Sequence, residues 1–310
     1  MKKILSLLLM GIMTMVLCQG CFSEAFIRYK LKQADMLESW TDKDGTIIKD
    51  IVYDQKKSLA YDLYLPAKIT EKAQYAMIFI HGGAWNSGDK SELSYGCRRF
   101  AKAGYTTVTL NYSLAKKDGP KITFFTMLDD ISNCLAHLKQ NMSQRNIQLK
   151  SIALSGYSAG GHLAMLYAFS RKEKSPVPVA FVFEQVGPTL FAPETWNNNK
   201  EFALKLASAG AGKTITEKDY QTGDYLSVVK TISPALLVDE NTVPGIYAYG
   251  AKDPLVIPAH YAALEKALKK YKVPYEMVKY NKSGHFLCDD PEQAQRYRSF
   301  ILEYAKKYFR

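Results

Sequence analysis

The residues whose types and spacing could do chemistry are found first in the pentapeptide 156–160, which reads Gly-Tyr-Ser-Ala-Gly. An apolar run at 152–154 precedes it and an apolar helical pattern follows it, which predicts a strand, a tight turn and a helix with Ser158 at the turn. The two glycines suit a strained turn at which neighbouring side chains would collide. Ser158 is therefore a candidate nucleophile, and the free N–H of Ala159 at the helix start could face a developing oxyanion. Taken alone, the pentapeptide would also fit a plain Gly/Ser turn.

A second motif, His-Gly-Gly-Ala-Trp at 81–85, follows a continuous apolar run at 75–80. Such a run is typical of a strand that is buried on both faces of a sheet. Paired glycines let the backbone approach a ligand closely and point its N–H groups toward it. By itself this motif would also fit an ordinary Gly-rich turn. Its position relative to the other motifs has to distinguish a ligand-binding loop from such a turn.

The elements that must position these motifs are predicted by hydrophobic periodicity. Apolar runs predict strands at 47–53, 59–65, 75–80, 105–111, 152–154, 179–186, 243–249 and 274–280. Helical spacing predicts helices near 93–103, 123–142, 258–271 and 292–308, and another after Ser158. The first two strands form an antiparallel start. The alternation from residue 75 onward predicts an α/β fold, with a mainly parallel eight-stranded sheet and helices on both faces.

Residues 187–232 interrupt this alternation and are long for a simple connection between a strand and a helix. We interpret them as a cap insertion over the site, with Leu190, Phe191 and Trp196 as candidate walls of a substrate pocket. The alternative is an ordinary crossover helix with long loops.

Four polar motifs follow predicted strands directly, at 81–85, 156–160, 253 and 283–286. Ligand sites in open parallel sheets lie beyond the carboxyl ends of the strands. A random set of motifs would not all fall on this one edge, so their shared placement predicts a single site there.

This combination of motifs resembles the α/β-hydrolase fold over roughly residues 45–309. The resemblance is to the esterase/lipase branch with an HGG-type oxyanion loop, which includes carboxylesterases and BD-FAE-like proteins. It rests on 81–85, on 156–160, on Asp253 after a strand, and on Ser-Gly-His at 283–285. The chain order of serine, acid and histidine is the one that this fold uses.

The resemblance implies that Ser158 is the nucleophile, that His285 takes up its proton, and that Asp253 orients His285. Asp253 is preferred as the acid because it follows the end of a strand and shortly precedes a helix. His285 is preferred as the base because it lies in a Gly-containing loop from which its side chain can reach back to Ser158. The less well placed alternatives are Asp224, Asp239, His162 and His260.

The family pattern also implies an oxyanion hole made by the backbone N–H groups of Gly83, Ala84 and Ala159. Ala84 departs from the HGGG form of the loop, which keeps the donor but leaves less space near the acyl group. The side chains expected around a substrate pocket are Trp85, Tyr157, Leu190, Phe191 and Trp196.

These features together predict a serine hydrolase that cleaves carboxylic esters, either short-chain acyl esters or acetylated or feruloylated saccharides, through an acyl-enzyme. The alternatives are an aryl formamidase or a serine peptidase of the same fold, and a catalytically silent binding module. No metal or organic cofactor is implied.

The N-terminal segment reads as a targeting signal. Lys2 and Lys3 precede an apolar run at 4–17, and Gly20 precedes Cys21, as at the cleavage site of a bacterial lipoprotein. We therefore expect a signal peptide at 1–21, lipidation of Cys21 and an extracytoplasmic, membrane-anchored protein. Ordinary secretion and an uncleaved anchor are the alternatives. A polar linker at 22–44 and the hydrolase domain at 45–310 would follow.

Composition narrows the class of protein further. The chain has 310 residues, 47% of them hydrophobic and 23% charged, which excludes wholesale disorder. The net charge of +11 comes from scattered lysines with no accompanying nucleic-acid motif, so we expect no nucleic-acid partner.

Beyond the targeting segment lie three cysteines, Cys97, Cys134 and Cys288, and three is too few and too odd a number for a complete disulfide framework. A bridge between the first two is possible by sequence, but buried thiols are favoured. No Cys/His spacing indicates a zinc site.

Overall fold

The computed structural model describes residues 39–116, 119 and 121–310. The predicted signal peptide with Cys21, and most of the predicted linker, lie outside the described residues. The described chain forms one sheet of eight strands in the order β1-β2-β4-β3-β5-β6-β7-β8. Pairing is antiparallel between β1 and β2 and between β2 and β4, and parallel from there to β8. The predicted α/β fold is thus confirmed, including its antiparallel start.

The strands agree with the apolar runs to within a few residues. They are β1 (Gly45–Asp54), β2 (Leu59–Pro66), β3 (Tyr75–Ile80), β4 (Thr106–Leu110), β5 (Ser151–Tyr157), β6 (Val179–Gln185), β7 (Gly245–Gly250) and β8 (Tyr275–Tyr280). The central strands β3, β4 and β7 are buried along their whole length, and the sequences of β3 and β7 therefore do not alternate between apolar and polar residues. Strand β4 contains three buried threonines, and each of their hydroxyls donates to a backbone carbonyl oxygen.

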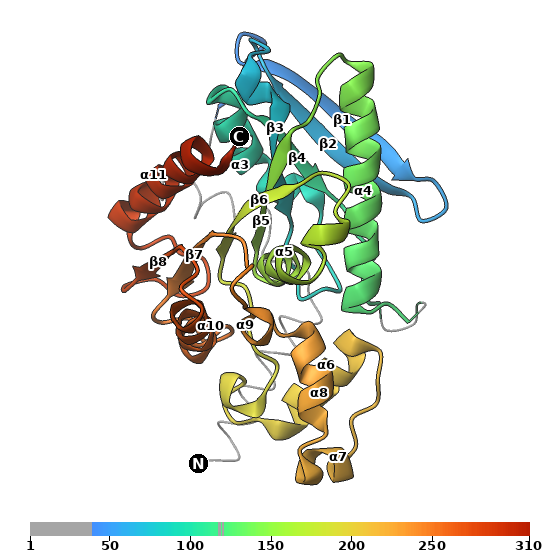
Figure 1. Cartoon of the computed structure of the whole chain (residues 1–310), viewed down its shortest axis with the longest axis vertical. Coiled ribbons are helices and arrows are strands. Elements are labelled where there is room, and N and C mark those ends of the chain that lie inside the picture. The colour runs from blue at the N-terminus through green and yellow to red at the C-terminus, as the bar shows by residue number, and fades with distance from the viewer. Residues whose placement is uncertain (1–38, 117–118, 120) are drawn as a thin grey trace.

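Helices cover both faces of the sheet (Figure 1). They are α3 (Ser94–Lys102), α4 (Phe124–Gln144), α5 (Ala159–Ser170), α6 (Lys200–Ala211), α7 (Glu217–Thr222), α8 (Tyr225–Ile232), α9 (Pro234–Leu237), α10 (Ala259–Lys270) and α11 (Pro291–Tyr308). Short 3-10 turns are η1 (Glu71–Gln74), η2 (Lys90–Leu93), η3 (Lys172–Lys174) and η4 (Pro193–Thr195). One hydrophobic core packs α4, α5 and α10 against the sheet, and a second packs α3 and α11 against its other face.

Helix α5, which follows the candidate nucleophile, lies in the middle of the first core. Its residues from Ala159 to Ala168 are all buried, so it is apolar on every side rather than amphipathic. A helix enclosed in this way cannot shift without disturbing its neighbours, and it therefore provides a rigid support for the turn at its N-terminus.

The segment between β6 and β7 contains several short helices instead of a single crossover helix. Helices α6, α7 and α8 lie together at one end of the molecule (Figure 1). Helix α6 packs on α4 so closely that a Cβ on Gly210 would lie 2.1 Å from the ring of Phe124. Whether these helices act as a cap over a substrate remains a prediction.

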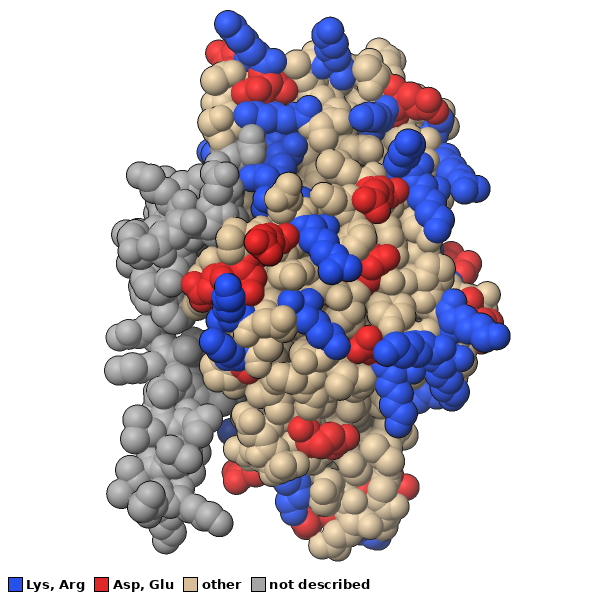
Figure 2. All heavy atoms as spheres, turned by 90° about the vertical axis from the view of Figure 1, so that its left-hand side faces the viewer, with Lys and Arg blue, Asp and Glu red and all other residues tan. Residues whose placement is uncertain are grey.

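The buried thiols and the scattered surface lysines expected from the sequence are both found in the structure. Cys97 and Cys134 are both buried and unbridged, and they lie in the two different cores, on opposite sides of the sheet. Lysines and arginines are interspersed with acidic residues over the face shown in Figure 2. Among the described residues, no helix is long and apolar enough to cross a membrane.

Candidate active site

The backbone turns sharply between β5 and α5. Ser158 has φ 54° and ψ −120°, a left-handed conformation that is strained for a residue with a side chain. A Cβ on Gly156 would lie 2.2 Å from the backbone of Gly160, and one on Gly160 would lie 1.9 Å from the carbonyl oxygen of Ile80. Both glycines are therefore required by close backbone packing, and the plain-turn alternative does not account for them.

Ser158, His285 and Asp253 lie in one hydrogen-bonded line. The Ser158 hydroxyl is 3.0 Å from Nε2 of His285, and Nδ1 of His285 is 2.7 Å from Oδ2 of Asp253. Because a carboxylate only accepts hydrogen bonds, Nδ1 carries the ring proton and Nε2 is left to accept from the serine. The structure thus brings together three residues that lie far apart in the sequence.

Asp253 is held from its other side by the backbone. Its Oδ1 accepts hydrogen bonds from the N–H groups of Leu255 (2.8 Å) and Val256 (3.0 Å), and the residue is buried. These two bonds fix the carboxyl plane, so that Oδ2 faces His285. The rival acids do not reach this position: Asp224 accepts from Thr222, and Asp239 caps the turn that follows it.

The loop that carries His285 is tied to its surroundings at two points. Asp290 accepts hydrogen bonds from the backbone N–H of Lys282 and from the hydroxyl of Ser283 (2.6 Å). The hydroxyl of Tyr157 donates to the carbonyl oxygen of His285 at 2.7 Å. The candidate base is therefore positioned by the residue that directly precedes the candidate nucleophile.

The glycine loop after β3 approaches the same place with an unusual backbone. Gly83, Ala84 and Trp85 have φ values of 98°, 49° and 61°, so three successive residues are left-handed. The carbonyl oxygen of Gly83 accepts from the N–H groups of Asn86 (3.1 Å) and Ser87 (3.0 Å). Within the described part of the chain, neither the Gly83 nor the Ala84 N–H donates to another backbone group. These N–H groups are therefore not used in backbone pairing, and their role as oxyanion donors stays a prediction.

His81 supports this loop from beneath. Its ring is buried and stacks on Tyr112, with ring centroids 4.3 Å apart, and its Nδ1–H donates to the carbonyl oxygen of Gly82 (2.8 Å). The Tyr112 hydroxyl donates to the His81 carbonyl oxygen (3.0 Å). Burial lowers the pKa of His81 to about 4, so the ring stays neutral near pH 7.

The side chains expected around a substrate pocket are divided between two places. Trp85 and Phe191 are buried in an aromatic cluster, and Trp196 packs against Phe191 with ring centroids 5.6 Å apart. Leu190 is half-buried beside them. Trp85 and Phe191 therefore fill space in this structure instead of lining an open wall. Hydrophobic periodicity could not distinguish a pocket wall from a buried packing residue, because aromatic side chains are common in both positions.

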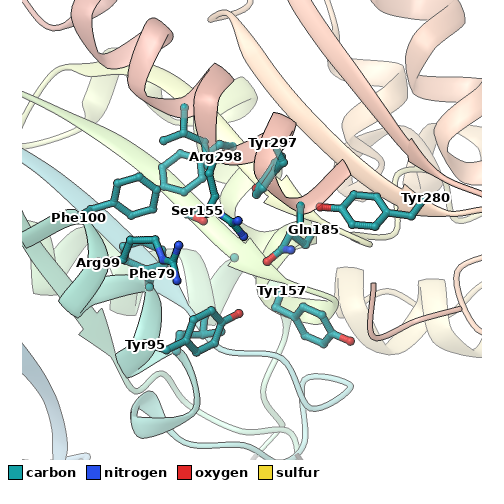
Figure 3. A pocket seen from close by; sticks show the side chains of 16 residues that line it. Phe79, Tyr95, Arg99, Phe100, Ser155, Tyr157, Gln185, Tyr280, Tyr297 and Arg298 are labelled. Atoms are coloured by element: carbon teal, nitrogen blue, oxygen red, sulfur yellow. The ribbon is translucent and has the colours of Figure 1, made fainter. Parts of the chain in front are cut away.

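Tyr157 lies on the other face of the sheet. It borders a cavity of about 50 Å³ between α3 and α11, to which Gly156 and Gln185 also contribute (Figure 3). Ser158 is not among the residues that line this cavity. Tyr157 contacts the candidate site through its hydroxyl and through its ring, which lies edge-on to the His285 imidazole with ring centroids 5.4 Å apart. Its role as a wall of a substrate pocket stays a prediction.

Glu184 is a buried carboxyl group that sequence reasoning missed. It pairs in register with Gly156 and accepts a hydrogen bond from the N–H of Gly187 at 2.7 Å. Its Oε2 would lie 2.7 Å from a Cβ on Gly161, in the first turn of α5. Burial raises the pKa of Glu184 to about 8. A glutamate inside an apolar strand was the available signal, since such a residue is seldom fully buried.

The sheet and the site geometry together define an α/β-hydrolase. The family model BD-FAE matches residues 61–268, and the chain belongs to this family. The family suggested by the sequence motifs is therefore confirmed.

Curated relatives and solved structures agree with this assignment. The chain is 26% identical to Esterase LipQ of Mycobacterium tuberculosis over 199 residues, covering 62% of this chain and 45% of that protein. It is 24% identical to bovine (Bos taurus) arylacetamide deacetylase over 209 residues, covering 65% and 49%. The chain thus spans about half the length of these curated relatives.

Among solved structures, Esterase B from Lactobacillus rhamnosis matches with a TM-score of 0.71 at 21% identity, covering 96% of this chain and 95% of that one. A truncated carbohydrate esterase from gut microbiota matches with a TM-score of 0.70 at 17% identity, covering 88% and 100%. At these identities the likeness establishes a shared fold.

Proposed function

We propose that this protein is a serine hydrolase that cleaves carboxylic esters through an acyl-enzyme on Ser158. The observation that carries the proposal is the hydrogen-bonded line from Ser158 through His285 to Asp253, with successive distances of 3.0 and 2.7 Å. Several relatives are named as esterases or deacetylases, which supports the same class of reaction.

In the first half of the reaction, Ser158 Oγ attacks the ester carbonyl carbon while its proton passes to Nε2 of His285. Asp253 stabilises the imidazolium that results. The N–H groups of Ala159, Gly83 and Ala84 bind the negative oxygen of the tetrahedral intermediate. When the intermediate collapses, the C–O bond to the alcohol breaks, and His285 returns the proton to the leaving alkoxide.

In the second half, water replaces the alcohol. His285 takes a proton from the water as it attacks the acyl carbon, and a second tetrahedral intermediate forms. Its collapse releases the carboxylic acid and returns the proton to Ser158. No group other than these residues and water is needed to balance either half.

We propose short-chain acyl esters, or acetylated or feruloylated saccharides, as the substrates. The family match and the structural likeness to a carbohydrate esterase support an ester of a sugar or of a small alcohol.

We also propose that the protein is exported and anchored in a membrane through a lipid on Cys21. The sequence at 1–21 supports this proposal. Replacing Cys21 with alanine should then move the protein from the membrane fraction to the soluble fraction.

The test of the catalytic proposal compares the protein with its Ser158→Ala variant on p-nitrophenyl acetate, butyrate and octanoate and on an acetylated xylan oligomer. We expect turnover in the wild type and a loss of about 10³-fold or more in the variant. A fluorophosphonate probe should label the wild type and leave the variant unlabelled. Folded wild-type protein that neither takes up the probe nor hydrolyses any of the esters would refute the proposal.

A further inference from the structure

His162 makes a hydrogen bond with each of its ring nitrogens, although it lies in the first turn of α5 and is completely buried. The indole N–H of Trp85 donates to Nδ1 at 3.2 Å. An indole nitrogen can only donate, so Nδ1 must be the unprotonated nitrogen of the ring. Nε2 therefore carries the proton and donates it to the carbonyl oxygen of Ile232 at 2.9 Å.

These two bonds join three segments that are distant in the sequence. Trp85 follows Ala84, whose N–H is a proposed oxyanion donor. His162 lies on the helix that begins just after Ser158. Ile232 is the last residue of α8, where carbonyl groups have no partner inside their own helix. The imidazole thus bridges the glycine loop, the nucleophile helix and the helical segment between β6 and β7.

The glycine loop depends on such contacts for its shape. Ala84 and Trp85 are both left-handed, at φ 49° and 61°, a conformation that is unfavourable for residues with a side chain. A strained segment persists only where the surrounding structure holds it in place. The Trp85 side chain provides that support, because it is buried against Phe124 and its nitrogen is fixed by His162.

The surroundings of His162 keep its ring neutral. Phe124 and Phe191 pack edge-on against it, with ring centroids 4.7 and 4.9 Å away. Burial lowers the pKa of His162 to about 4. The ring is therefore neutral near pH 7, which the hydrogen bonds to Trp85 and Ile232 require.

We infer that His162 is a positioning residue, which fixes the oxyanion loop through Trp85 and ties it to the C-terminal end of α8. The inference rests on the proposed esterase function and adds a role for a histidine that does not touch the reacting atoms. If the Trp85 bond is lost, the N–H groups of Gly83 and Ala84 should move out of line with the developing oxyanion.

Two amide substitutions separate the two bonds. In His162→Asn, the side-chain oxygen can replace Nδ1 and accept from Trp85, but the amide is too short to reach Ile232. In His162→Gln, the amide nitrogen can replace Nε2 and donate to Ile232, but the acceptor for Trp85 is lost. We expect His162→Gln to lower kcat by about tenfold or more with little change in KM, because oxyanion alignment acts in the transition state. His162→Asn should keep a kcat close to that of wild type.

Trp85→Phe keeps an aromatic ring and removes the N–H, so it should reproduce the loss of kcat. Combined with His162→Gln it should cause no further loss, since both changes break one bond. His260→Asn is the matched control. It alters another buried histidine of the same cluster and keeps the acceptor for the Thr189 N–H, so its kcat should stay near wild type.

Hydrogen exchange measures the same link without relying on turnover. Amides of residues 83–88 should exchange faster in His162→Gln than in His162→Asn, and amides at the end of α8 should show the reverse. Equal kcat values and equal exchange rates in His162→Gln and His162→Asn would overturn the inference. If His162→Gln does not fold, an unchanged kcat in Trp85→Phe would overturn it instead. Absent turnover in the wild type would instead refute the proposed function, and the exchange pattern would still decide the role of His162.

Discussion

The hydroxyl of Tyr157 donates a 2.7 Å hydrogen bond to the backbone carbonyl oxygen of His285, 128 positions further along the chain. The Tyr157 ring also lies edge-on to the imidazole, with ring centroids 5.4 Å apart. The residue next to the candidate nucleophile thus holds the loop that carries the candidate base. The elbow and the histidine loop are therefore coupled directly, and not only through the Ser158–His285 hydrogen bond.

Replacing Tyr157 with phenylalanine should reveal this coupling. The ring and its packing are kept, whereas the bond to the His285 carbonyl is lost. We expect the free energy of unfolding to fall by about 1 kcal/mol, the usual value for one hydrogen bond. We also expect kcat to fall by more than KM changes, because the histidine loop becomes less well aligned. Denaturant unfolding and steady-state kinetics measure the two effects. A variant with wild-type kcat would show that the loop is held adequately by Asp290 alone.

Replacing Gly160 with alanine should abolish folding or lower the free energy of unfolding by more than about 3 kcal/mol. The new Cβ would lie 1.9 Å from the Ile80 carbonyl oxygen, and backbone at the end of a central strand cannot move aside. Gly223→Ala is the control. Gly223 has φ +84° and no heavy atom near its Cβ position, so alanine there should cost only about 1 kcal/mol of backbone strain. Circular dichroism and urea unfolding distinguish the two variants. Equal stabilities would contradict the packing explanation.

The sequence predicts those parts of the site that depend on local order along the chain. Apolar runs give the strands, and Ser158, Asp253 and His285 each follow a strand, so their meeting at one sheet edge is a consequence of parallel topology. Contacts that depend on where a side chain turns after leaving the backbone were not predictable. The bond from Tyr157 to the His285 carbonyl and the packing of Trp85 on His162 are of this kind.

The identity of the acid can be tested with Asp253→Asn. Two backbone N–H groups point at Oδ1, so the asparagine oxygen should occupy that position and its NH₂ group should face His285. Nδ1 would then have to accept a hydrogen bond, which leaves the proton on Nε2, where it cannot take one from Ser158. We expect kcat to fall by about 10³–10⁴-fold with KM little changed.

Asp224→Asn is the control for this substitution. Asp224 lies between α7 and α8 and accepts from Thr222 rather than from His285, so its variant should turn over like the wild type. If Asp224→Asn lost activity and Asp253→Asn kept it, the assignment of the acid would be wrong.

Glu184 should make the free energy of unfolding fall as the pH rises, whereas the buried histidines should make it rise. Burial raises the pKa of Glu184 from 4.5 to about 8, so the folded state holds a proton that the unfolded state has released across this range. Stability is therefore lost as pH rises from 4.5 to 8, by about 1.4 kcal/mol for each pH unit, and is constant above that range. His81, His162 and His260 have lowered pKa values, so they favour the folded state as pH rises through the range below 6.5.

The Glu184→Gln variant isolates the glutamate, because the contribution of the histidines is common to both proteins and cancels in the difference. Glutamine keeps an oxygen to accept from the Gly187 N–H, and any cost of its unpaired amide does not vary with pH. The variant should gain stability relative to the wild type as the pH is raised from 5 to 8, with no further gain at pH 9. Urea unfolding at these pH values gives the difference directly. If the difference in free energy of unfolding between the two proteins did not change with pH, or changed in favour of the wild type as the pH rose, Glu184 would not be protonated in the folded protein at neutral pH.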